Sequence, residues 1–122
     1  MMDARSERNL KGVHPDLIKV VRRAAKKSSF IVTEGLRTLA RQKQLKAAGA
    51  SRTLNSRHIT GHAIDVAALF NGKVRWDWPL YLAIAKEMKQ AAVDLGVPIV
   101  WGGDWRSFKD GPHFELDRRQ YP

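Results

Sequence analysis

Residues 56–67 read SRHITGHAIDVA, and this stretch combines a polar turn with the beginning of an apolar run. Alternate side chains of a strand share one face, so Ile64 and Val66 are expected to point toward a core while Asp65 points the other way, between two alanines. The glycine of the turn can adopt backbone angles that other residues avoid, which allows His58 to fold back toward Asp65. The stretch therefore predicts an imidazole and a carboxylate close together on the small-residue face of a strand.

This pair is suited to a metal site, but such a site needs a further ligand. Catalytic zinc usually takes three protein ligands, such as two imidazoles and a carboxylate, and keeps a fourth position for water. The chain has no cysteine, so the ligands are limited to His, Asp and Glu. His113 stands out because it lies in the strand-like segment DGPHFEL, three residues after Asp110. A carboxylate beside the site can act as a general base. Asp110, Glu115 and Asp104 all lie near enough to His113 in the sequence to be candidates for this base.

The rest of the chain predicts alternating helices and strands. In chain order we expect a helix over 15–27, a strand over 29–35, a helix over 38–48, a polar loop over 50–58, a strand over 62–70 with a possible returning strand over 71–76, a helix over 77–95, and strands over 97–103 and 112–116. This order argues for a small α+β domain with a mostly antiparallel sheet flanked by helices. No repeat or linker divides residues 1–122, so we expect a single domain.

The 122-residue chain is strongly basic, with 22 Lys and Arg residues against 12 Asp and Glu residues and a formal charge of +10. Such a charge favours polyanions, including nucleic acid, anionic membrane surfaces and anionic cell-wall polymers. There is no arginine-rich arm or RNA-binding aromatic signature, so nucleic acid is not the expected partner. The N-terminal residues 1–12 lack the apolar core of a secretory signal, so we expect synthesis in the cytoplasm.

Two motifs give the chain a family resemblance. Residues 56–65 reproduce the pattern S-x-H-x-x-G-x-A-x-D, and residues 110–113 reproduce a downstream D-x-x-H. With these motifs the chain resembles the LAS-type zinc peptidases, named for lysostaphin, D-Ala-D-Ala carboxypeptidase and sonic hedgehog. Within that group it is most similar to the phage-encoded L-alanyl-D-glutamate endopeptidases that serve as endolysins. The supporting segments are RSERNLKGVHPDLIKVVRRA, VTEGLRTLARQKQLKAAG and IVWGGDW, so the resemblance covers almost the whole chain and leaves no room for a separate cell-wall-binding domain.

The resemblance implies a hedgehog/D-Ala-D-Ala-peptidase-like fold and a Zn²⁺ ion held by His58, Asp65 and His113. It implies that Asp110 is the general base, where some relatives use glutamate. Aspartate is shorter by one methylene, so its loop is expected to approach the site more closely. Arg37 matches the family arginine that contacts the substrate or polarises the scissile carbonyl.

The remaining candidates have supporting or structural roles. Ser56 matches a motif serine that is expected to support the site rather than react. Trp101 and Trp105 flank the segment GGD and are the tryptophans expected to border the site. His62 is expected on the face opposite the aspartate, and His14 precedes a proline at a helix start, so both are interpreted as structural.

The function predicted from the sequence is that of a zinc-dependent peptidoglycan hydrolase, a phage endolysin that cleaves the L-alanyl-D-glutamate bond of stem peptides. The alternatives are a D,D- or L,D-carboxypeptidase that releases D-alanine and a non-catalytic polyanion-binding module. The expected partners are peptidoglycan, an anionic envelope surface and a holin-type membrane-permeabilising protein. The enzyme is expected to be a monomer that acts on the cell wall after release from the host cytoplasm.

Overall fold

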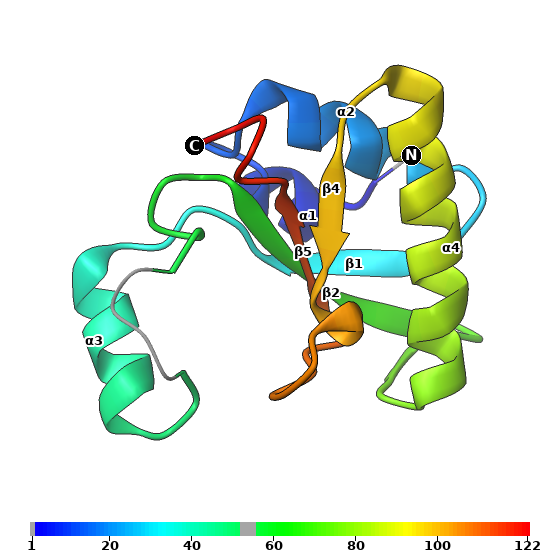
Figure 1. The fold of residues 1–122 in the computed structure, drawn as a ribbon. Helices are drawn as coiled ribbons and strands as arrows, with labels where there is room; N and C mark the ends of the chain where they lie inside the picture. Colours follow the sequence, from blue (N-terminus) through cyan, green and yellow to red (C-terminus); the bar gives the residue numbers. More distant parts are fainter. Residues whose placement is uncertain (1, 52–55) are drawn as a thin grey trace.

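A computed structural model of the chain describes residues 2–51 and 56–122 (Figure 1). Residues 52–55, which form part of the expected polar loop, lie outside the described residues. None of the helices that the structure describes has the length and apolar character needed to cross a membrane.

The strands of the described residues form one sheet, with the order β1-β2-β5-β4 and with β3 paired to β2. The strands are β1 (Phe30–Glu34), β2 (Ala63–Phe70), β3 (Lys73–Arg75), β4 (Ile99–Trp101) and β5 (His113–Leu116). Every pair is antiparallel, which confirms the predicted sheet. The possible returning strand over 71–76 is present as β3.

The predicted helices are also present, each within a few residues of its expected bounds. They are α2 (Pro15–Ala24), α3 (Leu39–Ala47) and α4 (Trp78–Leu95). His14 caps α2 by accepting a hydrogen bond on Nδ1 from the Asp16 amide, which confirms its structural role. Gly96 ends α4 with φ of 69°, a left-handed angle that glycine adopts without penalty.

The core lies between the sheet and the helix pair α2–α4, which pack against each other. Ile64 and Val66 belong to this core, as strand alternation predicted. Asp65 lies on the other face of β2, where it lines a pocket. Its neighbours on that face, Ala63 and Ala67, are small and buried.

The sequence did not predict α1 (Ala4–Asn9). Asp3 caps this helix through the Ser6 amide, but a six-residue helix has little stability of its own. A tertiary contact supplies further stability to the helix, because Ser6 is buried and its Oγ accepts a hydrogen bond from the Val32 amide of β1. That contact joins positions 26 residues apart and leaves no local signal in the sequence.

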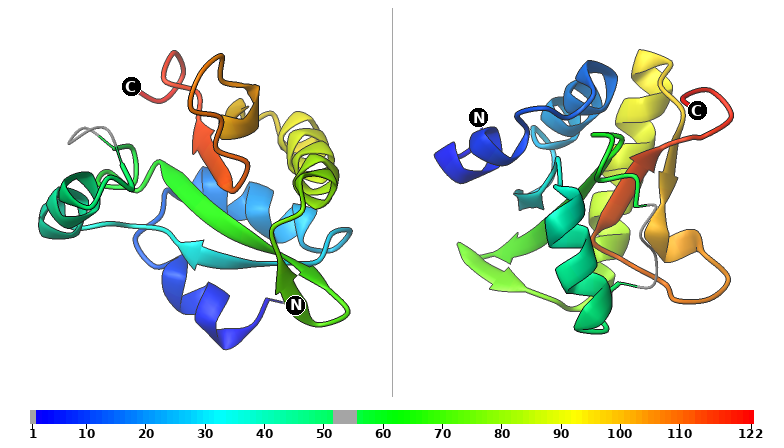
Figure 2. Two further views of the ribbon diagram at one scale, coloured as in Figure 1. Left: turned by 90° about the horizontal axis from the view of Figure 1, so that it is seen from below. Right: turned by 90° about the vertical axis from the view of Figure 1, so that its left-hand side faces the viewer.

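Helix α3 stands apart from the rest of the molecule, on the side opposite α4 (Figures 1 and 2). Gln42 is the residue of α3 that is buried. The segment that follows this helix, with residues Gly49–Ser51 in it, lines the same pocket as Asp65. Helix α3 and its C-terminal turn therefore form one side of the pocket rather than part of the core.

Candidate active site

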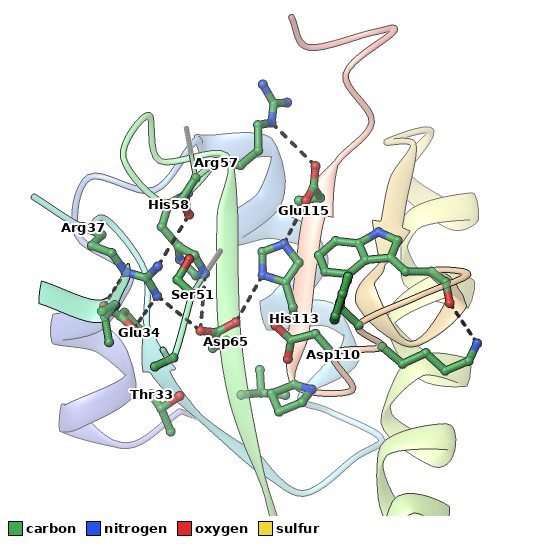
Figure 3. Close-up of a pocket in the computed structure, with 18 of the residues that line it drawn as sticks. Thr33, Glu34, Arg37, Ser51, Arg57, His58, Asp65, Asp110, His113 and Glu115 are labelled. Carbon is green, nitrogen blue, oxygen red and sulfur yellow. Dashed lines mark hydrogen bonds and ion pairs between the residues drawn. The ribbon is translucent and has the colours of Figure 1, made fainter. Parts of the chain in front are cut away.

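Two histidines and an aspartate converge on the open face of the sheet (Figure 3). Asp65 in β2 is paired directly with His113 at the start of β5, so their side chains emerge next to each other. His58 comes from the turn before β2, and its Nε2 lies 3.3 Å from Oδ2 of Asp65. Nδ1 of His113 lies 3.3 Å from Oδ1 of the same carboxylate. The predicted cluster of three potential ligands is therefore present.

The turn that places His58 depends on Gly61. Gly61 has φ of 77°, and a Cβ built on it would lie 2.4 Å from the Gly12 carbonyl oxygen. Any other residue would meet that backbone, so the turn requires glycine for both its angle and its space. The returning segment then carries the imidazole of His58 over Asp65, as the sequence predicted.

A hydrogen bond behind each imidazole determines which ring nitrogen faces the aspartate. Nδ1 of His58 lies 2.9 Å from the Gly35 carbonyl oxygen, so this nitrogen donates and Nε2 is left with its lone pair. Nε2 of His113 lies 2.8 Å from Oε1 of Glu115, which leaves Nδ1 directed toward Asp65. The donor atoms of the cluster lie within 4.8 Å of one another. Two imidazole nitrogens and a carboxylate oxygen in this arrangement fit a zinc ion.

The charges of the cluster agree with that fit. Burial favours the neutral acid at Asp65, but the adjacent imidazoles of His113 and His58 outweigh it and hold its pKa well below its usual range. Burial also opposes a charged imidazole at His113, yet hydrogen bonds to Asp65 and Glu115 raise its pKa to about 9. Without a metal, a proton on His113 therefore neutralises the surrounding carboxylates, which is the role that a cation would otherwise fill.

Asp110 lies beside the cluster, on the other side of His113 from Glu115 (Figure 3). Its amide donates to the Gly102 carbonyl oxygen at 3.0 Å, and its own carbonyl accepts from the His113 amide at 3.1 Å. A Cβ on Gly102 would lie 2.4 Å from the Asp110 carbonyl oxygen, so glycine allows this close approach. Burial and the negative charge of Asp65 raise the pKa of Asp110, which makes its carboxylate more basic than usual.

Arg37 lies on the opposite side of Asp65 and is largely occupied by the protein itself. It donates to both carboxylate oxygens of Glu34, at 2.8 and 2.6 Å, and to Oε1 of Gln42 at 2.7 Å. It also lies 3.5 Å from Oγ of Ser56 and 3.6 Å from Oδ2 of Asp65. Arg37 thus lies beside the predicted ligand Asp65 and presents part of its positive charge to the pocket.

The other predicted residues have different placements. Oγ of Ser56 accepts from the His58 amide at 3.2 Å, so this serine contacts both His58 and Arg37. Trp105 lines the pocket, and its ring lies 5.1 Å from that of His113. Trp101 does not border the pocket: the residue is 4% exposed and lies in the core. Its indole nitrogen donates to the Gly111 carbonyl oxygen at 2.7 Å, so it supports the loop that carries the candidate base.

Glu115 contacts the cluster, and the sequence left its role open. It was one of three candidate bases, but its carboxylate is bonded to the far nitrogen of His113. Alternation along β5 places positions 113 and 115 on one face, which is the signal that could have predicted this contact. Arg57 lies on the far side of Glu115, with Nε 3.7 Å from Oε2. The third candidate base, Asp104, is exposed and pairs with Lys89.

His58, Asp65 and His113 thus lie together on the open face of an antiparallel sheet, as the family resemblance of the sequence implies. The chain belongs to the family of phage L-alanyl-D-glutamate peptidases, which matches residues 1–120.

Individual relatives agree with this assignment. The L-alanyl-D-glutamate peptidase of Escherichia phage T5 is 40% identical over 122 residues, which cover 95% of this chain and 88% of the relative. The crystal structure of the Serratia marcescens L-Ala D-Glu endopeptidase ChiX has a TM-score of 0.93 and 53% identity, covering 98% of this chain and 91% of that one. A vancomycin-resistance D,D-dipeptidase, VanXYg, shares the fold with a TM-score of 0.55 and 20% identity, over 85% of this chain and 50% of that one.

Proposed function

We propose that this protein is a zinc-dependent endopeptidase that hydrolyses the bond between L-alanine and D-glutamate in the stem peptides of bacterial peptidoglycan. The observation that carries the proposal is the convergence of His58, Asp65 and His113 beside a basic carboxylate, in a chain of the L-alanyl-D-glutamate peptidase family. The pocket around them has a volume of about 950 Å³, enough for several residues of a peptide.

The metal would be held by Nε2 of His58, the carboxylate of Asp65 and Nδ1 of His113. A bound zinc ion supplies Lewis-acid chemistry, because it polarises a carbonyl oxygen and lowers the pKa of water toward neutrality. Glu115 contributes by holding the ring of His113 through its Nε2–H, which fixes both the orientation and the tautomer. The Gly35 carbonyl oxygen does the same for His58.

Asp110 is the proposed general base. Its raised pKa makes its carboxylate a stronger proton acceptor than an ordinary aspartate, so it can take the proton of the attacking water. The same group can then return that proton to the leaving amine of D-glutamate. The close contact of the Asp110 backbone with Gly102 suits an aspartate, whose side chain is shorter than glutamate and needs a nearer loop.

Arg37 is proposed to act in two ways, by holding Asp65 and by stabilising negative charge on the substrate carbonyl. A guanidinium has five N–H groups, and those of Arg37 are directed at Glu34, Gln42, Ser56 and Asp65. The long contacts to Ser56 and Asp65 are the weakest of these, so they are the ones that a substrate oxygen would replace.

The biological setting follows from the proposed reaction and the charge. We propose that the enzyme is made in the host cytoplasm as a monomer and reaches the cell wall through a holin-type membrane-permeabilising protein. The formal charge of +10 supports attraction to the anionic bacterial envelope.

The test is mass spectrometry of purified Gram-negative peptidoglycan after incubation with the zinc-loaded protein. A new amino terminus on D-glutamate is the expected product. The matched control is Asp110→Asn, which is expected to release no product. Loss of terminal D-alanine alone would make the protein a carboxypeptidase, and binding to peptidoglycan without cleavage would make it a binding module.

A further inference from the structure

Three aromatic side chains line the pocket, and we call Trp76, Trp105 and Phe108 the aromatic rim. Trp76 is 63% exposed and Phe108 is 61% exposed, whereas Trp101 and Phe114 are buried in the core. Exposed aromatic surface gathered in one pocket is typical of a binding site, because a ligand removes that surface from water.

The rim is held in place by the protein around it. The ring of Trp76 is stacked on that of Tyr81 at 6.0 Å and nearly parallel to it, so one face is supported and the ring remains largely open to the pocket. Phe108 has φ of 53°, a left-handed angle that a bulky residue adopts only where its surroundings impose it. Nζ of Lys109 donates to the Trp105 carbonyl oxygen at 2.9 Å and fastens this loop. Such preorganisation favours ligand binding.

The rim begins beside the proposed metal ligands, since the ring of Trp105 lies 5.1 Å from that of His113. In peptidoglycan the amino group of L-alanine is joined through a lactyl group to a muramic sugar. Cleavage on the carboxyl side of this alanine leaves one residue between the sugar and the scissile bond, and a residue spans at most about 3.6 Å. The sugar of a bound substrate therefore lies close to the catalytic residues.

The chemistry of the substrate decides what the rim can bind. The stem peptide offers alanine methyl groups and charged residues, but no large apolar side chain to cover three aromatic rings. A pyranose ring presents a face of C–H groups that packs on an aromatic ring, while its hydroxyl and amide groups stay toward water. We infer that the aromatic rim is a subsite for the N-acetylmuramic acid unit, so that the enzyme recognises sugar and peptide together. This inference rests on the proposed L-alanyl-D-glutamate cleavage.

The first test compares two synthetic substrates of the zinc-loaded enzyme. One is an N-acetylmuramyl tetrapeptide, and the other is the same tetrapeptide with a plain N-acetyl group in place of the muramyl group. We expect kcat/KM to be about tenfold or more higher for the muramyl substrate, the scale of one well-packed aromatic contact. Trp76→Ala and Phe108→Ala are each expected to lower this ratio toward one.

Phe70→Ala is the matched control, because Phe70 is 52% exposed and does not line the pocket. This variant is expected to keep the ratio of the unmodified enzyme. A ratio near one in the unmodified enzyme would overturn the inference. A ratio that persists in both rim variants would overturn it as well.

A second measurement is independent of hydrolysis. The protein is titrated with the disaccharide of N-acetylglucosamine and N-acetylmuramic acid, and the indole N–H signals are followed by NMR. We expect shifts for Trp76 and Trp105 and none for the buried Trp101. Indole shifts without cleavage of either substrate would refute the proposed reaction and keep the sugar site. Equal cleavage of both substrates without indole shifts would refute the sugar site and keep the reaction.

Discussion

Replacing Glu115 with glutamine tests how the protein holds its proposed metal ligand His113. Oε1 of Glu115 lies 2.8 Å from Nε2 of His113, and the residue is only 7% exposed. A glutamine oxygen can accept the same hydrogen bond, so the position of the ring is kept while the negative charge behind it is lost. Loss of such a supporting group typically weakens metal binding 10- to 100-fold, or by about 1.4–2.7 kcal/mol.

Two effects of this substitution oppose each other, and pH separates them. In the metal-free protein, burial disfavours the charged ring, but hydrogen bonds to Asp65 and Glu115 outweigh it and raise the pKa of His113 to about 9. At neutral pH a proton therefore competes with zinc for this imidazole. Glu115→Gln lowers that pKa and weakens the competition between proton and zinc, which offsets part of the loss of zinc affinity. Above pH 9 the proton has left His113 in both proteins, so the full loss of zinc affinity is expected there.

The assay is a zinc titration in competition with a chelator of known affinity, at neutral pH and again above the pKa of His113. The control is Arg118→Ala, because Arg118 also lies near Glu115, at 3.6 Å, but its side chain is 66% exposed and its ion pair is worth little. We expect zinc affinity in this control to stay within about twofold of the unmodified protein. Equal zinc affinities of Glu115→Gln and the unmodified protein above pH 9 would refute the supporting role of Glu115.

Three further outcomes are expected. Asp110→Asn should lower kcat by about 10²- to 10⁴-fold while one zinc ion per chain stays bound, and loss of the ion, measured by elemental analysis, would make Asp110 a ligand instead. Ser6→Ala should lower the free energy of unfolding in urea by about 1–3 kcal/mol, because the buried Val32 amide loses its acceptor; a change under about 0.5 kcal/mol would contradict this. In chelator-treated protein, the pKa of His113 is raised from 6.5 in the unfolded chain to about 9 in the folded protein, so the stability that the protonated ring contributes is complete below pH 6.5 and is lost as pH rises through about 9. The urea midpoint should therefore fall over this range, and a constant midpoint would contradict the prediction.

The sequence predicted the elements whose signals are local. Helices α2 and α4 have an apolar periodicity, and the strand β2 has the alternation that separates Ile64 from Asp65. The motif residues His58, Asp65 and His113 were identified through a family resemblance, and the structure brings them together.

Features that depend on distant contacts were not predictable in this way. Trp101 and Trp105 flank the same GGD segment, yet one enters the core and the other lines the pocket. The difference arises because the strand β4 ends at Trp101 and a 3₁₀ turn, η1 (Gly102–Asp104), then reverses the chain. Alternation along β5 places Glu115 on the same face as His113, but it does not show which nitrogen of the His113 ring the carboxylate contacts.

The register between β2 and β5 connects the core to the site. Ile64 is paired with Phe114 and both are fully buried, while the next pair along, Asp65 with His113, faces the pocket. Slipping β5 by one residue would put one of these polar groups into the core and expose an apolar one, so the burial of Ile64 and Phe114 specifies the register. A slip by two residues would keep the faces but move His113 away from Asp65, and it would also break the fit between the two large core residues. Apolar packing on one face of the sheet therefore determines the spacing of the proposed metal ligands on the other.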